Sequence, residues 1–465
     1  MRSISLPFRQ IHLDFHTSEE IVGIGRRFDP DQFADSLAKA HVNSVTCFAR
    51  CCHGWLYYDS KRHPDRVHPH LERNLLKEQI EACHSRGIRV PIYTVVQWDH
   101  LTASRNPGWV AVDTDGRPLN LSPLEPGFYR SLCLNSPYWG FLRDHIREIL
   151  ETFPTDGLFL DVVNPLDDSS VWTQSAMNKR GMDVTSKRQR QDYGAMLINE
   201  FCLQTTELVR SINDDCTVFF NRGHVGPHHR NVLEAFTHFE LESLPSGKWG
   251  YLHFPKTVRY ARTLDRQLIG QTGRFHTAWG DFHSFKNKAA LEYECFRMIS
   301  LGARCMIGDQ LLPDGTVEPY IYDVVGEVYG AVEEKEPWCV GSTPKVDIAL
   351  VTPEEYDQPS TRGELPEVDG GCRMLEELGH QFDIVDSKAD LSGYRLVILP
   401  DRIPVDDQLC EKLEEFATHG GAVIASFESG FNWATSAFAL EPLGIRFRDE
   451  GPRAPDGRLA RGRVF

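Results

Sequence analysis

The chain has 465 residues, of which 41% are hydrophobic and 25% are charged, a composition typical of a globular protein with enough core for two domains. Its 50 basic and 66 acidic side chains leave a net charge of −16, which argues against nucleic acid or an anionic membrane as the main partner. Residues 1–7 contain no apolar signal segment and no later run is long enough to span a membrane, so we expect a cytoplasmic protein.

Twelve cysteines are spread along the chain without any pair in the C-x-x-C spacing. That distribution predicts neither a zinc site nor a disulfide framework. Even the adjacent residues Cys51 and Cys52 are therefore expected to be reduced thiols.

Strand-like and helix-like segments alternate over the first 340 residues. A longer insert at 109–132, with a hairpin turn at Asp115-Gly116, interrupts the alternation. A parallel (β/α)8 TIM barrel at residues 1–340 is the most economical fold for this pattern. The predicted strands are 10–16, 42–49, 89–96, 155–163, 217–221, 237–242, 267–272 and 304–309, and the predicted helices are 29–40, 71–85, 137–153, 192–212, 255–264 and 286–301.

A second, smaller α/β unit is predicted at residues 345–440, after a boundary at 337–344. Its order of elements is flavodoxin-like, but no glycine-rich phosphate loop follows its first strand, so no nucleotide or other cofactor is expected. The tail at 441–465, rich in Gly, Pro and Arg, resembles a loop or the stub of a truncated domain. The predicted strands are 346–352, 381–385, 394–399 and 420–425, and the predicted helices are 370–379 and 407–418.

One carboxylate, Asp161, ends a strand that is otherwise apolar on both faces. An ionised side chain there is costly unless the strand opens into a cavity, and in a parallel barrel the active site lies at the C-terminal strand ends. The alternative is that Asp161 caps a turn or forms a buried ion pair.

Two further carboxylates, Glu240 and Glu242, alternate on the sixth predicted strand and therefore share a face, with Glu242 nearer the mouth. Together with Asp161 they provide the two carboxyl groups that glycoside hydrolysis requires, one at the anomeric carbon and one to protonate the leaving oxygen. Close carboxylates also raise one pKa, which keeps the acid protonated. The alternative is ion pairing with one of three basic residues, namely Arg222, Lys248 or Arg274.

Several blocks of residues 8–340 resemble the glycosyl-hydrolase barrels related to α-L-fucosidases, in glycoside hydrolase families 29 and 151. Each block is short, but together they form a specific pattern. The blocks are 10–19, 53–58, 133–137, 156–161, 240–245, 249–251 and 308–311.

This resemblance implies a retaining exo-glycosidase, first of all an α-L-fucosidase, with Asp161 as the nucleophile. It favours Glu242 as the acid/base residue and leaves Glu240 in reserve. Fucosidases often have paired His where this chain has Cys52-His53, so one hydrogen bond to the sugar is expected to be missing. We expect no metal, and His16 to be a satisfied core residue. The candidate substrate-binding residues are His12, Asp14, His53, Trp55, Tyr57, Trp98, Asn221, Glu240, Trp249 and Asp309.

The second unit resembles the trimerisation domain that follows the barrel in family 42 β-galactosidases, in a shortened form. This resemblance implies a homotrimer. The glycosidase resemblance implies a carbohydrate as the substrate, and from the net charge we expect neither nucleic acid nor membrane as a partner.

Two other functions remain open at this point. A metal-dependent amidohydrolase would also place ligands at strand ends, but its first-strand motif is His-x-His, whereas here an Asp intervenes. A non-catalytic carbohydrate-binding or scaffold protein would keep the aromatic residues without needing a carboxylate pair. The amidohydrolase ligands would come from His12, Asp14, His16, His224, His238 and Asp309.

Overall fold

The computed structural model of the chain describes residues 4–119, 130–281, 283–356, 365–432, 437–440 and 444. Its contacts divide the chain into two compact units, Met1–Pro344 and Lys345–Phe465. The predicted tail at 441–465 lies outside the described residues apart from Gly444, as does the part of the predicted insert at 120–129.

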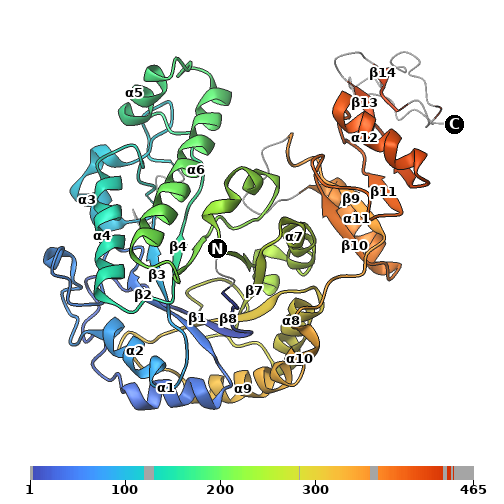
Figure 1. The fold of residues 1–465 in the computed structure, drawn as a ribbon. Helices are drawn as coiled ribbons and strands as arrows, with labels where there is room; N and C mark the ends of the chain where they lie inside the picture. The colour runs from blue at the N-terminus through green and yellow to red at the C-terminus, as the bar shows by residue number, and fades with distance from the viewer. Residues whose placement is uncertain are drawn as a thin grey trace. The chain divides into compact units, whose positions relative to one another are not determined.

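The first unit is a (β/α)8 barrel, as predicted. Its eight parallel strands form one sheet in the order β5-β4-β3-β2-β1-β8-β7-β6, so that each strand lies beside its neighbour in sequence (Figure 1). The strands are β1 (Arg9–Asp14), β2 (Ser44–Arg50), β3 (Pro91–Val95), β4 (Gly157–Asp161), β5 (Thr217–Phe220), β6 (His238–Glu242), β7 (Gln267–Gly273) and β8 (Arg304–Gln310).

The ring is nearly closed between its two end strands, β5 and β6. At the N-terminal end of β6, the backbone N–H of Thr237 donates to the carbonyl of Val218 at 3.2 Å, and its hydroxyl accepts from the N–H of Val218 at 2.9 Å. The strand ends at the opposite edge therefore converge on a single mouth.

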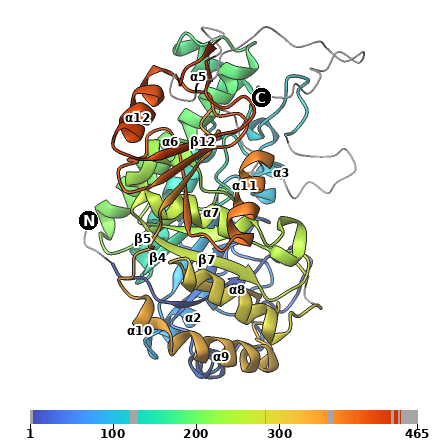
Figure 2. The same cartoon turned by 90° about the vertical axis from the view of Figure 1, so that its right-hand side faces the viewer.

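Helices cover the outside of the ring, and neighbouring helices contact one another at α1–α2, α1–α9, α8–α9 and α4–α6 (Figures 1 and 2). Among the described residues, no helix is long and apolar enough to cross a membrane. The helices of this unit are α1 (Pro30–Lys39), α2 (Leu75–His84), α3 (His100–Arg105), α4 (Tyr138–Thr152), α5 (Val171–Lys179), α6 (Lys187–Ile212), α7 (His253–Ala261), α8 (Lys288–Ser300), α9 (Pro319–Glu333) and α10 (Glu336–Cys339), with 3-10 turns at η1 (Pro64–Arg66), η2 (Pro107–Trp109), η4 (Pro227–Ala235) and η6 (Arg262–Leu264) and a π turn at η5 (Pro245–Trp249).

The predicted hairpin turn of the insert is present. Gly116 adopts φ +80°, a backbone conformation that favours glycine, and the N–H of Asp113 donates to the carbonyl of Arg117 at 2.8 Å. The sequence pattern did not predict α3, α5, α9 or α10, and α6 begins five residues before the predicted start at Asp192.

The barrel interior is filled by alternate residues of each strand. The ring of Tyr93 stacks on Phe48 at 3.7 Å between centroids and packs against Phe159 at 5.7 Å. The imidazole of His12 fills the space between these strands, 4.9 Å from Phe159. This aromatic layer closes the barrel below its mouth.

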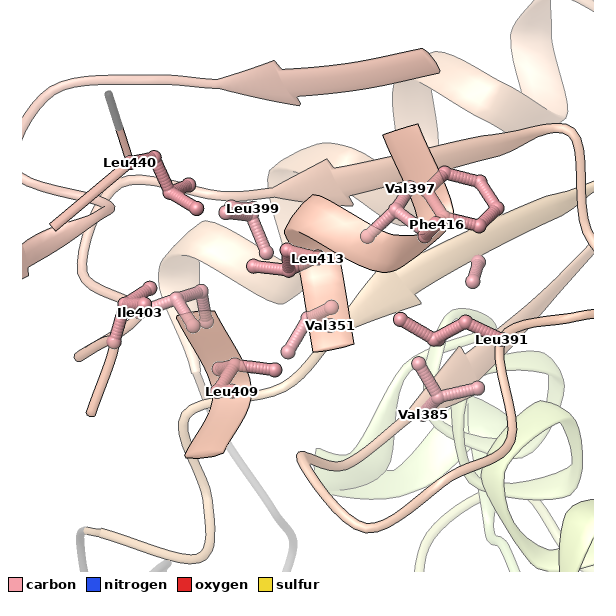
Figure 3. Packing of buried hydrophobic residues seen from close by; sticks show 12 residues of the cluster. Val351, Val385, Leu391, Val397, Leu399, Ile403, Leu409, Leu413, Phe416 and Leu440 are labelled. Atoms are coloured by element: carbon pink, nitrogen blue, oxygen red, sulfur yellow. The ribbon is translucent and has the colours of Figure 1, made fainter. Parts of the chain in front are cut away.

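The second unit is a four-stranded parallel sheet in the order β10-β9-β11-β12, the flavodoxin-like arrangement that the sequence predicts. Its core is aliphatic, with Val351, Val397 and Leu399 of the sheet packed against Leu409 and Leu413 of a helix (Figure 3). The elements are β9 (Ile348–Val351), α11 (Pro366–Glu377), β10 (Phe382–Val385), β11 (Leu396–Leu399), α12 (Asp407–Thr418) and β12 (Ala422–Ala425), with a short pair β13 (Phe431–Asn432) and β14 (Ala437–Phe438).

Candidate active site

Two carboxylates meet at the mouth of the barrel through one amide. The Nδ2 of Asn221, just after β5, lies 2.9 Å from Asp161 Oδ1 and 2.9 Å from Glu242 Oε2. Those two oxygens are therefore no more than 5.8 Å apart, twice that distance. An amide NH2 has two hydrogens, so Asn221 donates one to each carboxylate.

Asp161 is also held from the neighbouring strand, because the hydroxyl of Tyr93 donates to its Oδ2 at 2.6 Å. The next residue, Val162, adopts φ +57°, which is a strained conformation for a β-branched side chain. The strain coincides with the point where β4 stops and turns into the mouth. Both oxygens of Asp161 thus have fixed partners on a rigid strand end.

Glu242 is fixed by Asn221 and by a tryptophan of the loop after β7. The indole Nε1 of Trp279 donates to Glu242 Oε1 at 2.8 Å. The centroid of that indole ring lies 5.2 Å from the centroid of the His12 ring. The indole also lies against Gly308, where an added Cβ would stand 2.4 Å from it. A side chain at position 308 would displace Trp279, so glycine is required there.

The two carboxyl groups differ in their electrostatic surroundings. Burial raises the pKa of both Asp161 and Glu242 above the usual values. The charge of Asp161 raises the pKa of Glu242 further, whereas the nearby imidazole of His16 lowers that of Asp161. Donors from Tyr93 and Asn221 also lower the pKa of Asp161. Trp279 and Asn221 likewise donate to Glu242 and lower its pKa, so the two groups differ in their charged neighbours: His16 favours ionisation of Asp161, whereas Asp161 and Asp14 oppose ionisation of Glu242.

The first strand contributes a second polar group to this mouth. His16 Nε2 lies 2.9 Å from Asp14 Oδ1. Burial alone would lower the pKa of His16, but the carboxylate of Asp14 raises it well above its usual value. His16 is hydrogen-bonded, as expected of a satisfied residue, but it is half-buried beside Asp14 after the end of β1 and not in the core. Burial also lowers the pKa of His12 to about 4, so its ring is neutral.

The loop after β2 brings the predicted residues His53 and Trp55 to the same end of the barrel. Gly54 between them adopts φ +93°, and a Cβ there would stand 2.3 Å from Asp99 Oδ1. Burial, with the charge of His16, lowers the pKa of His53 to about 4. Trp55 donates its indole N–H to Glu19 at 3.2 Å.

Five buried side chains of the barrel strands have polar atoms without a hydrogen-bond partner among the described residues. Glu240 lies one layer below Glu242; its Oε1 pairs with His238 Nε2 at 2.9 Å, but its Oε2 has no partner. This depth leaves Glu242 as the carboxylate nearer the mouth. The unpartnered atoms are His12 Nδ1, Ser44 Oγ, Glu240 Oε2, Gln271 Oε1, and both Oε1 and Nε2 of Gln310.

Two predicted binding residues have other roles in the structure. Tyr57 is fully buried, and its hydroxyl bonds to the Thr17 N–H at 3.1 Å and to the Thr17 hydroxyl at 2.8 Å, which fixes the loop after β1. Asp309 follows the inward-facing Gly308, so it points to the outer face of β8. There it pairs with Arg274 Nε at 2.8 Å and interacts with Tyr322 of α9.

Two other predicted residues, Trp98 and Trp249, are half-buried. Trp98 follows β3 and forms an isolated bridge with Ser131, whereas Trp249 packs edge-on against His253 at 4.6 Å. Both remain predictions as substrate contacts.

The residues that an amidohydrolase would require do not gather. His238 pairs with Glu240 within the barrel, and Asp309 lies on its outer face. Across the described ranges, no group of three or more His, Cys, Asp or Glu side chains is arranged to hold a metal ion.

Two residues that hold the carboxylates were not predicted. Tyr93 lies in the mostly apolar strand β3, and nothing in the neighbouring sequence distinguishes it from a tyrosine of the core. Trp279 belongs to a long aromatic loop after the seventh strand, and such βα loops line the mouth of a barrel. Its position in that loop was the sequence feature that could have indicated a role for Trp279 at the mouth.

Comparisons with known proteins agree with this geometry. Residues 29–162 match the family model "Hypothetical glycosyl hydrolase 6", and residues 372–443 match "Beta-galactosidase trimerisation domain". A comparison with the curated proteins finds no match. Among solved structures, the chain is similar to an α-L-fucosidase, isoenzyme 2, from Paenibacillus thiaminolyticus, with 39% identity and a TM-score of 0.89. The match covers 94% of this chain and 66% of that one, slightly under two thirds of its length.

Two β-galactosidases share the fold. One, from the psychrophilic Marinomonas ef1, is 15% identical with a TM-score of 0.65, and the match covers 91% of this chain and 76% of that one. The other, from Bacillus circulans sp. alkalophilus, is 14% identical with a TM-score of 0.68, covering 91% and 72%. The chain thus joins a barrel of the glycosyl hydrolase kind to a domain of the β-galactosidase trimerisation family.

Proposed function

We propose that the chain is a retaining exo-acting glycoside hydrolase that cleaves α-L-fucosides, with Asp161 as nucleophile and Glu242 as acid/base residue. The observation that carries this proposal is the bridge from Asn221 to both carboxylates, which limits two of their oxygens to 5.8 Å. Retaining glycosidases keep their carboxyl groups about 5–5.5 Å apart, whereas inverting enzymes need about 6.5–9.5 Å for a water molecule. The similarity to the fucosidase supports the choice of sugar.

The electrostatic asymmetry of the pair fits these roles. In the first step Asp161 forms a bond to the anomeric carbon while Glu242 gives its proton to the departing oxygen. In the second step Glu242 takes a proton from water, the water oxygen bonds to the anomeric carbon, and the bond to Asp161 breaks. Tyr93 and Asn221 hold Asp161, so that its carboxylate is aimed before the substrate arrives.

We also propose that the second unit assembles the chain into a homotrimer, because residues 372–443 match a trimerisation domain. A particle mass in solution close to the 52.9 kDa of a single chain would contradict this assembly.

Replacement of the nucleophile tests the proposed chemistry. Asp161→Asn keeps the size and a hydrogen-bonding oxygen but cannot attack the anomeric carbon, so turnover of 4-nitrophenyl α-L-fucoside should fall by about three orders of magnitude or more. Circular dichroism and the melting temperature of the variant should show that it is folded. Near-normal turnover in a folded Asp161→Asn variant would remove Asp161 from the mechanism.

Leaving-group chemistry tests the acid/base role. Glu242→Ala should slow substrates with poor leaving groups far more than activated aryl fucosides, since only the former need protonation. Added azide should restore turnover of the activated substrates, because it needs no general base. Glu240→Ala is the matched control. If the leaving-group dependence and the azide rescue appear in Glu240→Ala and not in Glu242→Ala, Glu240 is the acid/base residue and Glu242 is not.

The pH profile should separate the two carboxyl groups. Trp279 stabilises the charged form of Glu242, so Trp279→Phe should raise the pKa of Glu242 and move the alkaline limb of kcat/KM to higher pH. Tyr93→Phe should instead raise the pKa of Asp161 and move the acid limb to higher pH. If each variant moves both limbs equally, the assignment of one limb to each residue is wrong.

A further inference from the structure

The side-chain amide of Gln310, the last residue of β8, is buried without a hydrogen bond from the described part of the protein. The residue is 3% exposed, and neither Oε1 nor Nε2 has a partner. An unsatisfied buried polar group destabilises a fold, so folding alone gives no reason to place an amide there. Gln10, on the same face of β1 as His12, shows the usual arrangement, since its Nε2 donates to the Pro7 carbonyl at 3.0 Å.

The strand register places Gln310 at the mouth. Two residues earlier, Gly308 faces the indole of Trp279, so strand alternation turns Gln310 to the same inner side. In the ladder between β1 and β8, Gln310 lies beside Asp14, whose charge raises the pKa of Glu242. Gln310 therefore lies on the inner side of the barrel, at the same end as the carboxylate pair.

The topology also places Gln310 opposite the nucleophile. In the strand order, β8 is the fourth strand from β4 in either direction around the ring, so the ends of β4 and β8 face each other across the mouth. Asp161 ends β4 and Gln310 ends β8. In a pyranose ring, the carbon opposite the anomeric carbon is C4, and C3 adjoins it.

We propose that Gln310 is a specificity-determining residue that binds the adjacent hydroxyls at C3 and C4 of the sugar whose anomeric carbon meets Asp161. A primary amide suits two neighbouring hydroxyls because its NH2 group donates to one while its oxygen accepts from the other. Occupation by a diol would satisfy both unpartnered atoms at once. This inference rests on the proposed glycosidase function and adds the part of the sugar that is recognised.

The test compares 4-nitrophenyl α-L-fucoside with its 3-deoxy and 4-deoxy analogues. Wild-type protein should lose about tenfold to a hundredfold in kcat/KM on a deoxy analogue, since its buried amide is then left unpaired. Gln310→Met should lose about as much on the parent substrate and discriminate at least tenfold less against the analogues. Gln310→Leu should behave in the same way.

Thermal unfolding without substrate provides a readout that a purely structural role would not give. Gln310→Met removes unpaired polar atoms, so its melting temperature should equal or exceed that of the wild type. Gln10→Met, the matched control, removes a satisfied hydrogen bond; its melting temperature should fall while its discrimination between the substrates stays unchanged.

Unchanged deoxy-sugar discrimination in Gln310→Met, in a wild type that cleaves the fucoside, would overturn the role of Gln310 alone. A large fall in the melting temperature of Gln310→Met would also overturn it, because the amide would then be satisfied within the fold. A wild type that does not cleave the fucoside at all would overturn the proposed function together with this inference.

Discussion

The site depends on one amide that holds two half-buried carboxylates close together. Two like charges within 5.8 Å and partly withdrawn from water repel each other, so the pair is most stable when one member keeps its proton. Asn221 donates to both groups and fixes their separation without choosing between them. The two groups differ in their charged neighbours, since Asp161 lies near the imidazole of His16, whereas Glu242, although it accepts from Trp279, lies near the charges of Asp161 and Asp14. In the proposed mechanism this difference makes Asp161 the nucleophile and Glu242 the acid at the same pH.

The barrel provides this arrangement because parallel strands end at one edge. Asp161, Asn221 and Glu242 come from β4, β5 and β6, where the ring is least tightly paired, and yet each lies at a rigid strand end. Opposite them, β1 and β8 present Asp14 and Gln310. The aromatic layer below excludes water from the floor, which strengthens electrostatic interactions above it. In the proposed mechanism the reacting groups thus lie on one side and the recognition groups on the other.

Much of this architecture could be predicted from the sequence because its signals are local. Apolar runs and caps gave the eight strands of the barrel and the order of the second unit, and a carboxylate at the end of an apolar strand marked Asp161. Period-two alternation likewise placed Glu240 below Glu242. Asp309 was predicted to bind substrate but lies on the outer face of β8. The local pattern shows only that a residue lies near the end of a strand. The face that it occupies follows from the contact of Gly308 with Trp279, which joins two distant segments.

Other features depend on partners that no local pattern reveals. Tyr57 and Tyr93 are both buried tyrosines near strand ends, yet one hydroxyl bonds to Thr17 and the other to Asp161. His16 is predicted to be a core residue, but its ring lies between two partners far apart in the local pattern, Asp14 at Nε2 and the Cys52 N–H at Nδ1. Gln310 is of interest because its buried side-chain amide has no hydrogen-bond partner among the described residues. Only the folded barrel shows this.

The stereochemistry of the first-formed product tests the central claim most directly, because the separation of Asp161 and Glu242 determines it. Proton NMR during cleavage of 4-nitrophenyl α-L-fucoside distinguishes the two anomers of free fucose before they equilibrate. The account predicts that the α anomer appears first, as required when Asp161 forms and then releases a covalent intermediate. Initial release of the β anomer would show that water attacks directly, and would contradict the role of Asp161 as nucleophile.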